Sequence, residues 1–168
     1  MKGPLCNFCL QTGILCGKCQ SLLDSGELTN LDITVAMELN KLERKYTELK
    51  DITFYRAVEV GPLVVVLVGE HDLPVILGQR GRIIKALEKN LVKRIRVIET
   101  ASSTGKMIED LLTPAEVAGI NTIWLPDGTT VKKVRIRNFD RKKLPASVDT
   151  LEGIILQLTR EPIRIVFE

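Results

Sequence analysis

The chain has 168 residues, of which 45% are hydrophobic, 27% are charged and only 4% are aromatic. A chain of this length and composition can bury one or two small cores and is not disordered by composition. Its longest apolar run, residues 63–68, is far too short to cross a bilayer, and cysteines interrupt the region in which a signal peptide needs an apolar core. We therefore expect a cytoplasmic protein that has no membrane segment.

The basic residues are concentrated in two segments, although the net charge is only +3. Residues 78–96 hold seven Lys and Arg side chains against Glu88, and residues 131–143 hold seven against Asp140. The rest of the chain is therefore acidic. Such segregation of charge favours a polyanionic partner over simple solubility.

All four cysteines lie in two C-x-x-C pairs near the start of the sequence, Cys6 with Cys9 and Cys16 with Cys19. Two such turns can bring four thiolates into a tetrahedron, the arrangement of a structural zinc site. Two disulfides and an iron–sulfur cluster are the alternatives, and disulfides are rare in a reducing cytoplasm. Because four protein ligands would fill the coordination of zinc, the metal is expected to be structural and not catalytic. We expect a separate zinc-binding head over residues 1–26, whose loss leaves the rest of the chain folded.

The middle of the chain alternates between helical and strand patterns. Apolar residues at three- and four-residue steps predict an amphipathic helix over residues 31–49, capped by Thr29 or Asn30. Runs rich in β-branched residues predict strands at residues 53–60 and 63–68, joined as a hairpin.

A short helix and a second, basic helix are expected after the hairpin. Asp72 caps the short helix, Pro74 lies in its first turn, and it ends near Gly78. The second helix has an apolar face and an outward stripe of cations. Its inward positions are Ile83, Ile84, Leu87 and Leu91, and its stripe consists of Arg82, Lys85 and Lys89. A strand at residues 94–99 follows.

The two helices are separated by Gly78-Gln79-Arg80-Gly81. Glycines three residues apart let the backbone turn sharply and let a partner approach without Cβ clashes. The free amide groups at the start of the next helix suit a phosphate. A helix-turn-helix with glycines in its turn is the common structural alternative, but the cations after this loop favour phosphate binding.

The order helix, strand, strand, helix, G-x-x-G, helix, strand over residues 31–99 resembles the type II KH domain, which binds RNA and single-stranded DNA. The family implies a groove for about four nucleotides, with the nucleic-acid backbone at the loop and the bases on an apolar floor. The residues that match the signature loop are Gly78, Gln79, Arg80 and Gly81. From the helical stripe we place three further cations beside phosphates, namely Arg82, Lys85 and Lys89.

From residue 104 onward the chain repeats this plan in altered form. Leu144-Pro145 echoes Leu73-Pro74 at a separation of 71 residues, and residues 163–166 echo residues 95–98 at a separation of 68. About three residues are therefore missing where the second G-x-x-G loop would lie. An unrelated α+β tail is the alternative to a second KH-like domain.

The expected elements of this half are a short helix, two strands and one long helix. Thr113-Pro114-Ala115-Glu116 has the form of a capping box with proline at the first helical position, so it should start the short helix. The other elements are strands at 120–125 and 129–137, joined at Asp127-Gly128, and a helix at 147–159.

Three side chains in this half are assigned with their alternatives. Alternation along residues 131–137 places Lys133, Arg135 and Arg137 on one face, where they either contact phosphates or form an ordinary exposed face. Trp124 is expected in the core, with stacking on a base as the alternative. His71, the only histidine, is expected to mark a helix entry.

Two KH-type domains in a chain of this length, together with residues 118–128, resemble the archaeal NusA-like transcription factors. The cysteine head and the missing second loop depart from the simplest members of that group. The sequence therefore predicts an α+β fold with a small zinc-binding head and two tandem type II KH-like domains, at residues 29–101 and 104–168, the second without a G-x-x-G loop.

The predicted function is non-enzymatic recognition of single-stranded RNA, in transcription elongation or termination. The main alternative is a zinc-organised adaptor that docks on RNA polymerase or the ribosome through protein contacts. RNA processing and DNA-binding regulation through the cysteine head are further alternatives. We expect no small-molecule substrate, because the sequence has no paired carboxylates, Cys/His dyad, Walker loop or open metal site.

Overall fold

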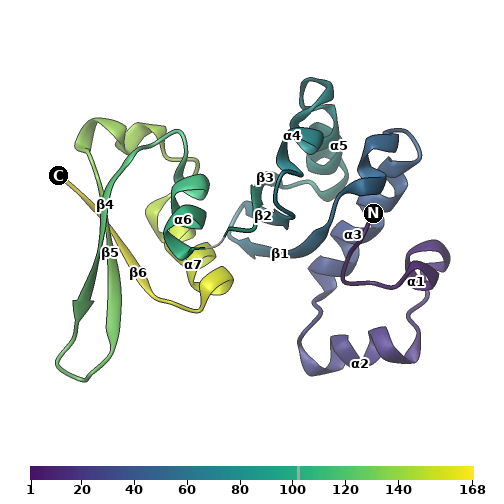
Figure 1. Cartoon of the computed structure of the whole chain (residues 1–168), viewed down its shortest axis with the longest axis horizontal. Helices are drawn as coiled ribbons and strands as arrows, with labels where there is room; N and C mark the ends of the chain where they lie inside the picture. Colours follow the sequence, from purple (N-terminus) through teal and green to yellow (C-terminus); the bar gives the residue numbers. More distant parts are fainter. Residues whose placement is uncertain (102) are drawn as a thin grey trace. The chain divides into compact units, whose positions relative to one another are not determined.

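The computed structural model describes residues 1–101 and 103–168, which form two compact units (Figure 1). Unit 1 is Met1–Thr100 and unit 2 is Ala101–Glu168. Each unit contains one three-stranded sheet and several helices, so the chain has the α+β architecture that the sequence predicted. Within the described residues, none of the helices has the length and apolar character that crossing a membrane requires.

Unit 1 begins with two short helices and continues as a helix-and-sheet domain. Its helices are α1 (Asn7–Thr12), α2 (Gly17–Ser25), α3 (Asn30–Glu43), η1 (Thr47–Asp51), α4 (Leu73–Leu77), η2 (Gln79–Gly81) and α5 (Arg82–Leu91). Its strands are β1 (Phe54–Val60), β2 (Leu63–Val68) and β3 (Arg94–Glu99). The sheet has the order β1-β2-β3, in which β2 is antiparallel to β1 and parallel to β3.

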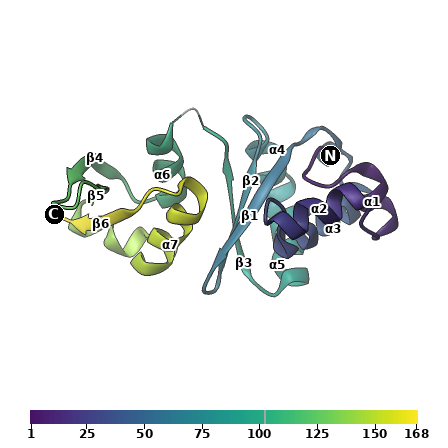
Figure 2. The same ribbon diagram turned by 90° about the horizontal axis from the view of Figure 1, so that it is seen from below.

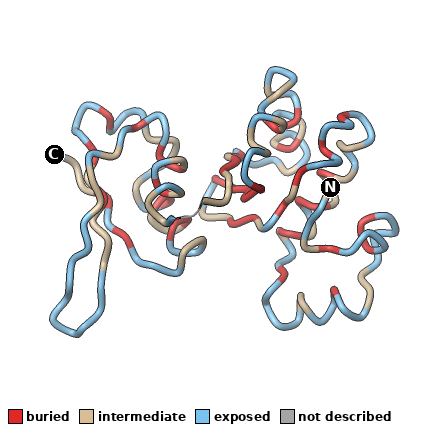
Figure 3. Tube along the Cα trace, in the orientation of Figure 1, coloured by how far each residue is buried: buried red, intermediate tan, exposed pale blue. Residues whose placement is uncertain are grey.

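Helices α3 and α5 cover one face of this sheet (Figure 2). All six residues of the central strand β2 are buried, as its unbroken apolar run predicted. The helices contribute fully buried side chains such as Val35, Leu39 and Leu87 to the same cluster as Val64 and Val66. Figure 3 shows buried segments in both units of the chain. The apolar face of α5 therefore lies in the core, and its basic face lies outside.

Helix α3 is shorter than predicted. Thr29 caps it in a reciprocal capping box with Asp32, and it ends at Glu43 instead of residue 49. Tyr46 and Leu49 are nevertheless buried, because the 3₁₀ turn η1 carries the apolar pattern onward. The apolar periodicity correctly predicted that Tyr46 and Leu49 are buried, but it did not reveal that the helix ends before them.

The cysteine head is part of unit 1 and not a compact unit of its own. Cys9 and Cys19 are almost completely buried, in the cluster that also contains Val35 and Leu39. Lys2 forms a parallel bridge with Thr53 at the start of the sheet. The expectation that the head could be lost without affecting the rest rested on separate apolar faces, and this shared core contradicts that premise.

Unit 2 has the same order of strands as unit 1. It consists of α6 (Thr104–Leu112), β4 (Val117–Trp124), β5 (Thr130–Ile136), the 3₁₀ helix η3 (Asn138–Lys143), α7 (Val148–Thr159) and β6 (Ile163–Phe167). The sheet has the order β4-β5-β6, with β5 antiparallel to β4 and parallel to β6. Unit 2 therefore repeats the strand order and the strand directions of the sheet in unit 1.

The predicted helix start at Thr113 is wrong. Thr113 is the residue that ends α6, and its hydroxyl donates to the Glu109 carbonyl oxygen at 2.9 Å. Proline is as suited to the residue after a helix as to the first turn of one, and a strand follows Pro114 within three residues.

Strand register defines how the two units correspond. In both units the first strand has a shift in pairing register after its first residue. The residue before the shift is Phe54 in unit 1, which pairs with Val68, and Val117 in unit 2, which pairs with Ile136. Val68 is therefore equivalent to Ile136. From there the parallel pairs agree, because Val64 pairs with Ile95 and the equivalent Lys132 pairs with Ile163, in each case a partner 31 residues later.

The equal spacing corrects the expected deletion. No residues are missing from the connection between the second and third strands, and Leu144-Pro145 is not the counterpart of Leu73-Pro74. The length difference lies in the hairpin instead, since Phe54 and Val68 are 14 residues apart whereas Val117 and Ile136 are 19 apart. The positions equivalent to residues 78–81 are 146–149, where α7 begins.

Candidate metal centre and nucleic-acid interface

Four cysteine sulfurs converge in the head of unit 1. Cys6 and Cys16 are the N-cap residues of α1 and α2, and Cys9 and Cys19 lie one turn later. All four sulfurs are within 4.8 Å of one another, with 3.3 Å between Cys6 and Cys9 and 3.9 Å between Cys6 and Cys16. These separations are too long for disulfide bonds and fit four sulfur ligands around one ion. The cluster could therefore hold a metal ion.

Backbone amides stabilise negative charge on this cluster. The N–H of Cys16 donates to the Cys9 sulfur at 3.1 Å, and the N–H of Cys19 donates to the Cys16 sulfur at 3.5 Å. The Cys19 N–H and the neighbouring thiols lower the pKa of Cys16 to about 6, and the Cys9 N–H lowers that of Cys6. The Cys16 N–H also acts to lower the pKa of Cys9, but burial and the other three sulfurs raise it to about 12. A bound cation would compensate for this crowding of thiolates.

The 78–81 loop adopts a conformation that only part of its sequence favours. Gln79, Arg80 and Gly81 all have left-handed backbones, with φ of 58°, 57° and 72°. Each non-glycine residue in this region costs about 1–2 kcal/mol. Gly78 has an ordinary φ, but a Cβ there would lie 3.2 Å from the Val75 carbonyl oxygen. Gly78 is therefore required because a side chain would not fit there, whereas Gly81 is favoured because its φ is positive.

Helix α5 starts directly at this loop and has no side-chain cap. Its N-cap residue is Gly81, so no side chain caps the helix, although the Arg82 N–H already donates to the Gln79 carbonyl oxygen and only the amides after it lack a cap. A Cβ added to Gly81 would meet no atom within 4 Å, so the space beside these amides is open. The positive end of the helix is therefore available to an external anion.

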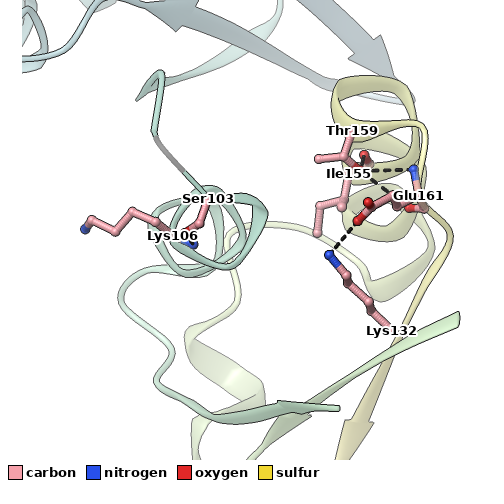
Figure 4. A network of polar contacts seen from close by, with 6 residues as sticks. All are labelled: Ser103, Lys106, Lys132, Ile155, Thr159 and Glu161. Atoms are coloured by element: carbon pink, nitrogen blue, oxygen red, sulfur yellow. Dashed lines mark hydrogen bonds and ion pairs between the residues drawn. The ribbon is translucent and has the colours of Figure 1, made fainter. Parts of the chain in front are cut away.

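The predicted cations surround this helix start and are free of acidic partners. The exposed residues of the cluster are Arg80, Arg82, Lys85 and Lys89. In the part of the chain that the structure describes, none of their side chains forms an ion pair or a hydrogen bond. Cations elsewhere differ: Lys132 pairs with Glu161 beside the end of α7 (Figure 4), and Lys93 pairs with Glu59.

The second predicted cluster is divided by the structure. Val134 and Ile136 are buried, so alternation places Lys133 and Arg135 on the opposite face of the sheet, as predicted. Arg135 lies against Gly119 and within 3.6 Å of the Glu168 carboxylate, which offsets its charge. Arg137 follows the end of β5 and belongs to the next segment instead.

The position in unit 2 that is equivalent to the loop is closed to anions. The Ser147 hydroxyl accepts from the Thr150 N–H and caps α7, and Asp149 lies in the first turn. An internal cap and a carboxylate at a helix start leave neither free amides nor a positive potential for a phosphate. Unit 2 thus has the plan of unit 1 without its uncapped, glycine-flanked helix start.

Two exposed aromatic side chains in unit 2 were not anticipated. Trp124 is 75% exposed at the end of the β4–β5 hairpin, so its expected place in the core is wrong. Phe139 is 66% exposed in η3. The basic residues that flank Phe139 in the sequence could have indicated that its ring is exposed. The exposure of Trp124 depends on the length of the β4–β5 hairpin, which is set by strand register and not by a local sequence pattern.

Comparison with known proteins supports the fold and leaves the function open. No family model and no curated protein matches the chain. A solved structure, titled "Crystal structure of APE1850", aligns with 78% of this chain and 95% of its own, with 19% sequence identity and a TM-score of 0.59. That share is larger than unit 1 alone, so the similarity in fold extends over parts of both units.

Proposed function

We propose that this protein is a non-enzymatic RNA-binding protein that recognises single-stranded RNA through the 78–81 loop and the start of α5. The observation that carries the proposal is the junction of a glycine-flanked loop with an uncapped helix start and four unpaired cations. The resemblance of residues 31–99 to a type II KH domain supports the same ligand class.

The physical basis of the proposal is complementarity to the phosphate backbone. The Arg82 N–H is bonded to Gln79 within the loop, so the next amides in the first turn of α5 would donate to phosphate oxygens, and the helix dipole would favour the negative charge. Arg82, Lys85 and Lys89 lie on one exposed stripe and would meet successive phosphates. The open space around Gly81 would let the nucleic-acid backbone approach closely.

Zinc is the metal that we propose for the four-cysteine cluster. Four thiolates in a tetrahedral set are the typical ligands of structural zinc, and all four positions would be filled by protein. The metal would then stabilise unit 1 and would have no open position for a substrate. Its place in the shared core links metal binding to folding.

One observation favours a second candidate function, an adaptor that docks on RNA polymerase or the ribosome through protein contacts. Ile123, Trp124 and Leu125 are all exposed at the end of the β4–β5 hairpin. A group of large apolar side chains at the tip of a hairpin suits a protein partner. We propose transcription elongation or termination as the setting in which both surfaces would be used.

Binding of fluorescent oligonucleotides tests the proposed function. We expect single-stranded RNA to bind more tightly than duplex DNA of equal length, with an affinity that falls as salt rises. Each neutralised phosphate contributes about −0.7 to the slope of log K against log salt for a single strand, so three or four contacts give about −2 to −3. Equal binding of duplex DNA, or a slope near zero, would contradict the proposal.

A further inference from the structure

The 3₁₀ helix η3 presents an aromatic ring among cations on the surface of unit 2. Phe139 is 66% exposed, and the Arg137 guanidinium lies 5.8 Å from the centre of its ring. Arg141 and Lys142 are exposed in the same short segment. We refer to Arg137, Phe139, Arg141 and Lys142 together as the η3 surface.

Two contacts fix the position of η3 in unit 2. Asp140 is fully buried and pairs with Lys143, whose Nζ lies 2.6 Å from its Oδ1. The Asn138 N–H donates to the Glu168 carbonyl oxygen at 2.8 Å, which ties η3 to the end of the sheet. The ring of Phe139 is therefore presented by an anchored turn, and its exposure does not come from a loose loop.

The charges of the η3 surface are not neutralised within the protein. Lys143 is the cation that Asp140 pairs with, and this contact raises its pKa. Among the described residues, Arg137, Arg141 and Lys142 have no acidic partner. Arg141 instead lies 4.8 Å from the centre of the Phe167 ring. The cations near the exposed Phe139 ring are Arg137 and Lys143, whose Nζ lies 5.7 Å from the ring centre, and Arg141 and Lys142 add unpaired charge in the same segment. This surface is therefore complementary to a ligand with both negative charge and flat aromatic groups.

We propose that the η3 surface is a second contact site for single-stranded nucleic acid, in which a base stacks on Phe139 and phosphates contact Arg137, Arg141 and Lys142. The inference rests on the proposed function for its ligand class, but it does not require the 78–81 loop to bind. It assigns unit 2 a role that the capped start of α7 cannot supply. An acidic peptide would pair with the cations but would leave the phenyl ring unused, whereas a base uses both.

A relocated tryptophan gives a direct readout of stacking. The chain has one Trp, so the full-length variant that combines Trp124→Phe with Phe139→Trp has its only indole in η3. Titration with single-stranded oligouridine should quench its fluorescence, and polyglutamate at equal charge should not. Binding of oligouridine without quenching, or quenching by polyglutamate alone, would overturn the proposal.

An affinity test in a loop-disabled protein separates this inference from the proposed function. In the full chain that carries Gln79→Asp and Arg80→Asp, adding Phe139→Leu should weaken the remaining oligouridine affinity by at least about fivefold, the lower range for loss of one stacked base. Phe8→Leu, at another ring that is 59% exposed, is the matched control and should change nothing.

The outcomes distinguish the two claims. If the loop variant keeps wild-type affinity while Phe139→Leu weakens it, the inference stands and the proposed loop function fails. If Phe139→Leu and Phe8→Leu behave alike, the inference fails whatever the loop variant shows.

Discussion

The Gln79 side-chain amide donates a hydrogen bond to the Glu48 carboxylate at 3.3 Å, which links the 78–81 loop to η1. Both side chains are exposed. The contact orients the loop residue, but it also places a negative charge beside the proposed phosphate position. Glu48 therefore opposes the ligand that the neighbouring cations would attract.

Replacing Glu48 by Gln should strengthen RNA binding. The substitution keeps an acceptor for Gln79 and removes one exposed negative charge, so affinity for single-stranded RNA should rise about two- to threefold at low salt and less at high salt. Fluorescence anisotropy measures the change, with Glu27→Gln as a charge-matched control at an exposed site between α2 and α3. A lower affinity than wild type would count against phosphate binding at the loop.

Loss of one metal ligand should destabilise all of unit 1. Cys6 is exposed, so Cys6→Ser disturbs the metal cluster without cutting into the core. Wild-type protein should carry about one zinc per chain and Cys6→Ser much less. At free zinc a thousandfold above its Kd, the lost binding is worth about 4 kcal/mol of unfolding free energy.

Hydrogen exchange distinguishes this outcome from the loss of an independent head. Amides of α3 should lose protection together with those of α2, because Cys9 and Cys19 share a core with Val35 and Leu39. Lys18→Ser, at an exposed non-ligand position between the cysteines, is the control. Full protection of α3 in metal-free protein would show that the head folds separately after all.

Asp32 should contribute more to stability than an ordinary helix cap. Its carboxylate closes the capping box with Thr29 and also accepts the buried Ala57 N–H at 2.7 Å. Thr29→Ala should cost about 1 kcal/mol, the usual value for a cap. Asp32→Ala should cost about 2–4 kcal/mol, since it also leaves a buried amide unpaired. Equal costs in urea denaturation would show that the contact with β1 adds nothing.

Trp124 should be nearly irrelevant to folding. Because its side chain is 75% exposed, Trp124→Ala should change the free energy of unfolding by less than about 1 kcal/mol. Ile136→Ala, at a fully buried position in the neighbouring strand, should cost about 2–5 kcal/mol. A large destabilisation by Trp124→Ala would restore the core position that the sequence suggested.

Sequence reasoning succeeded where one physical requirement dominates a segment. Strand β2 has the predicted bounds because six consecutive apolar residues can only be buried, and the Arg82, Lys85 and Lys89 stripe is exposed because α5 needs its apolar face inside. The convergence of four cysteines followed from their spacing in the same way.

Sequence reasoning failed where local signals serve two structures equally well. Pro114 fits a helix start and a helix end, and only the tertiary packing of α6 decides between them. The length of the β4–β5 hairpin depends on which residues pair, so the exposure of Trp124 was beyond a local pattern. The burial of the head in the core of unit 1 is likewise a long-range contact.

The most direct test of the proposed function is the RNA affinity of the full-length variant with Gln79→Asp and Arg80→Asp. Both glycines remain, and Asp tolerates the left-handed conformation, so folding should be retained while two negative charges replace the phosphate site. Gln157→Asp with Arg160→Asp, two exposed positions at the end of α7, makes the same change in net charge and serves as the control. We predict at least a tenfold loss of affinity for single-stranded RNA, or about 1.4 kcal/mol, together with a shallower salt dependence, in the loop variant alone. Wild-type affinity and an unchanged salt slope in the loop variant, or equal losses in both variants, would contradict recognition of RNA by this loop.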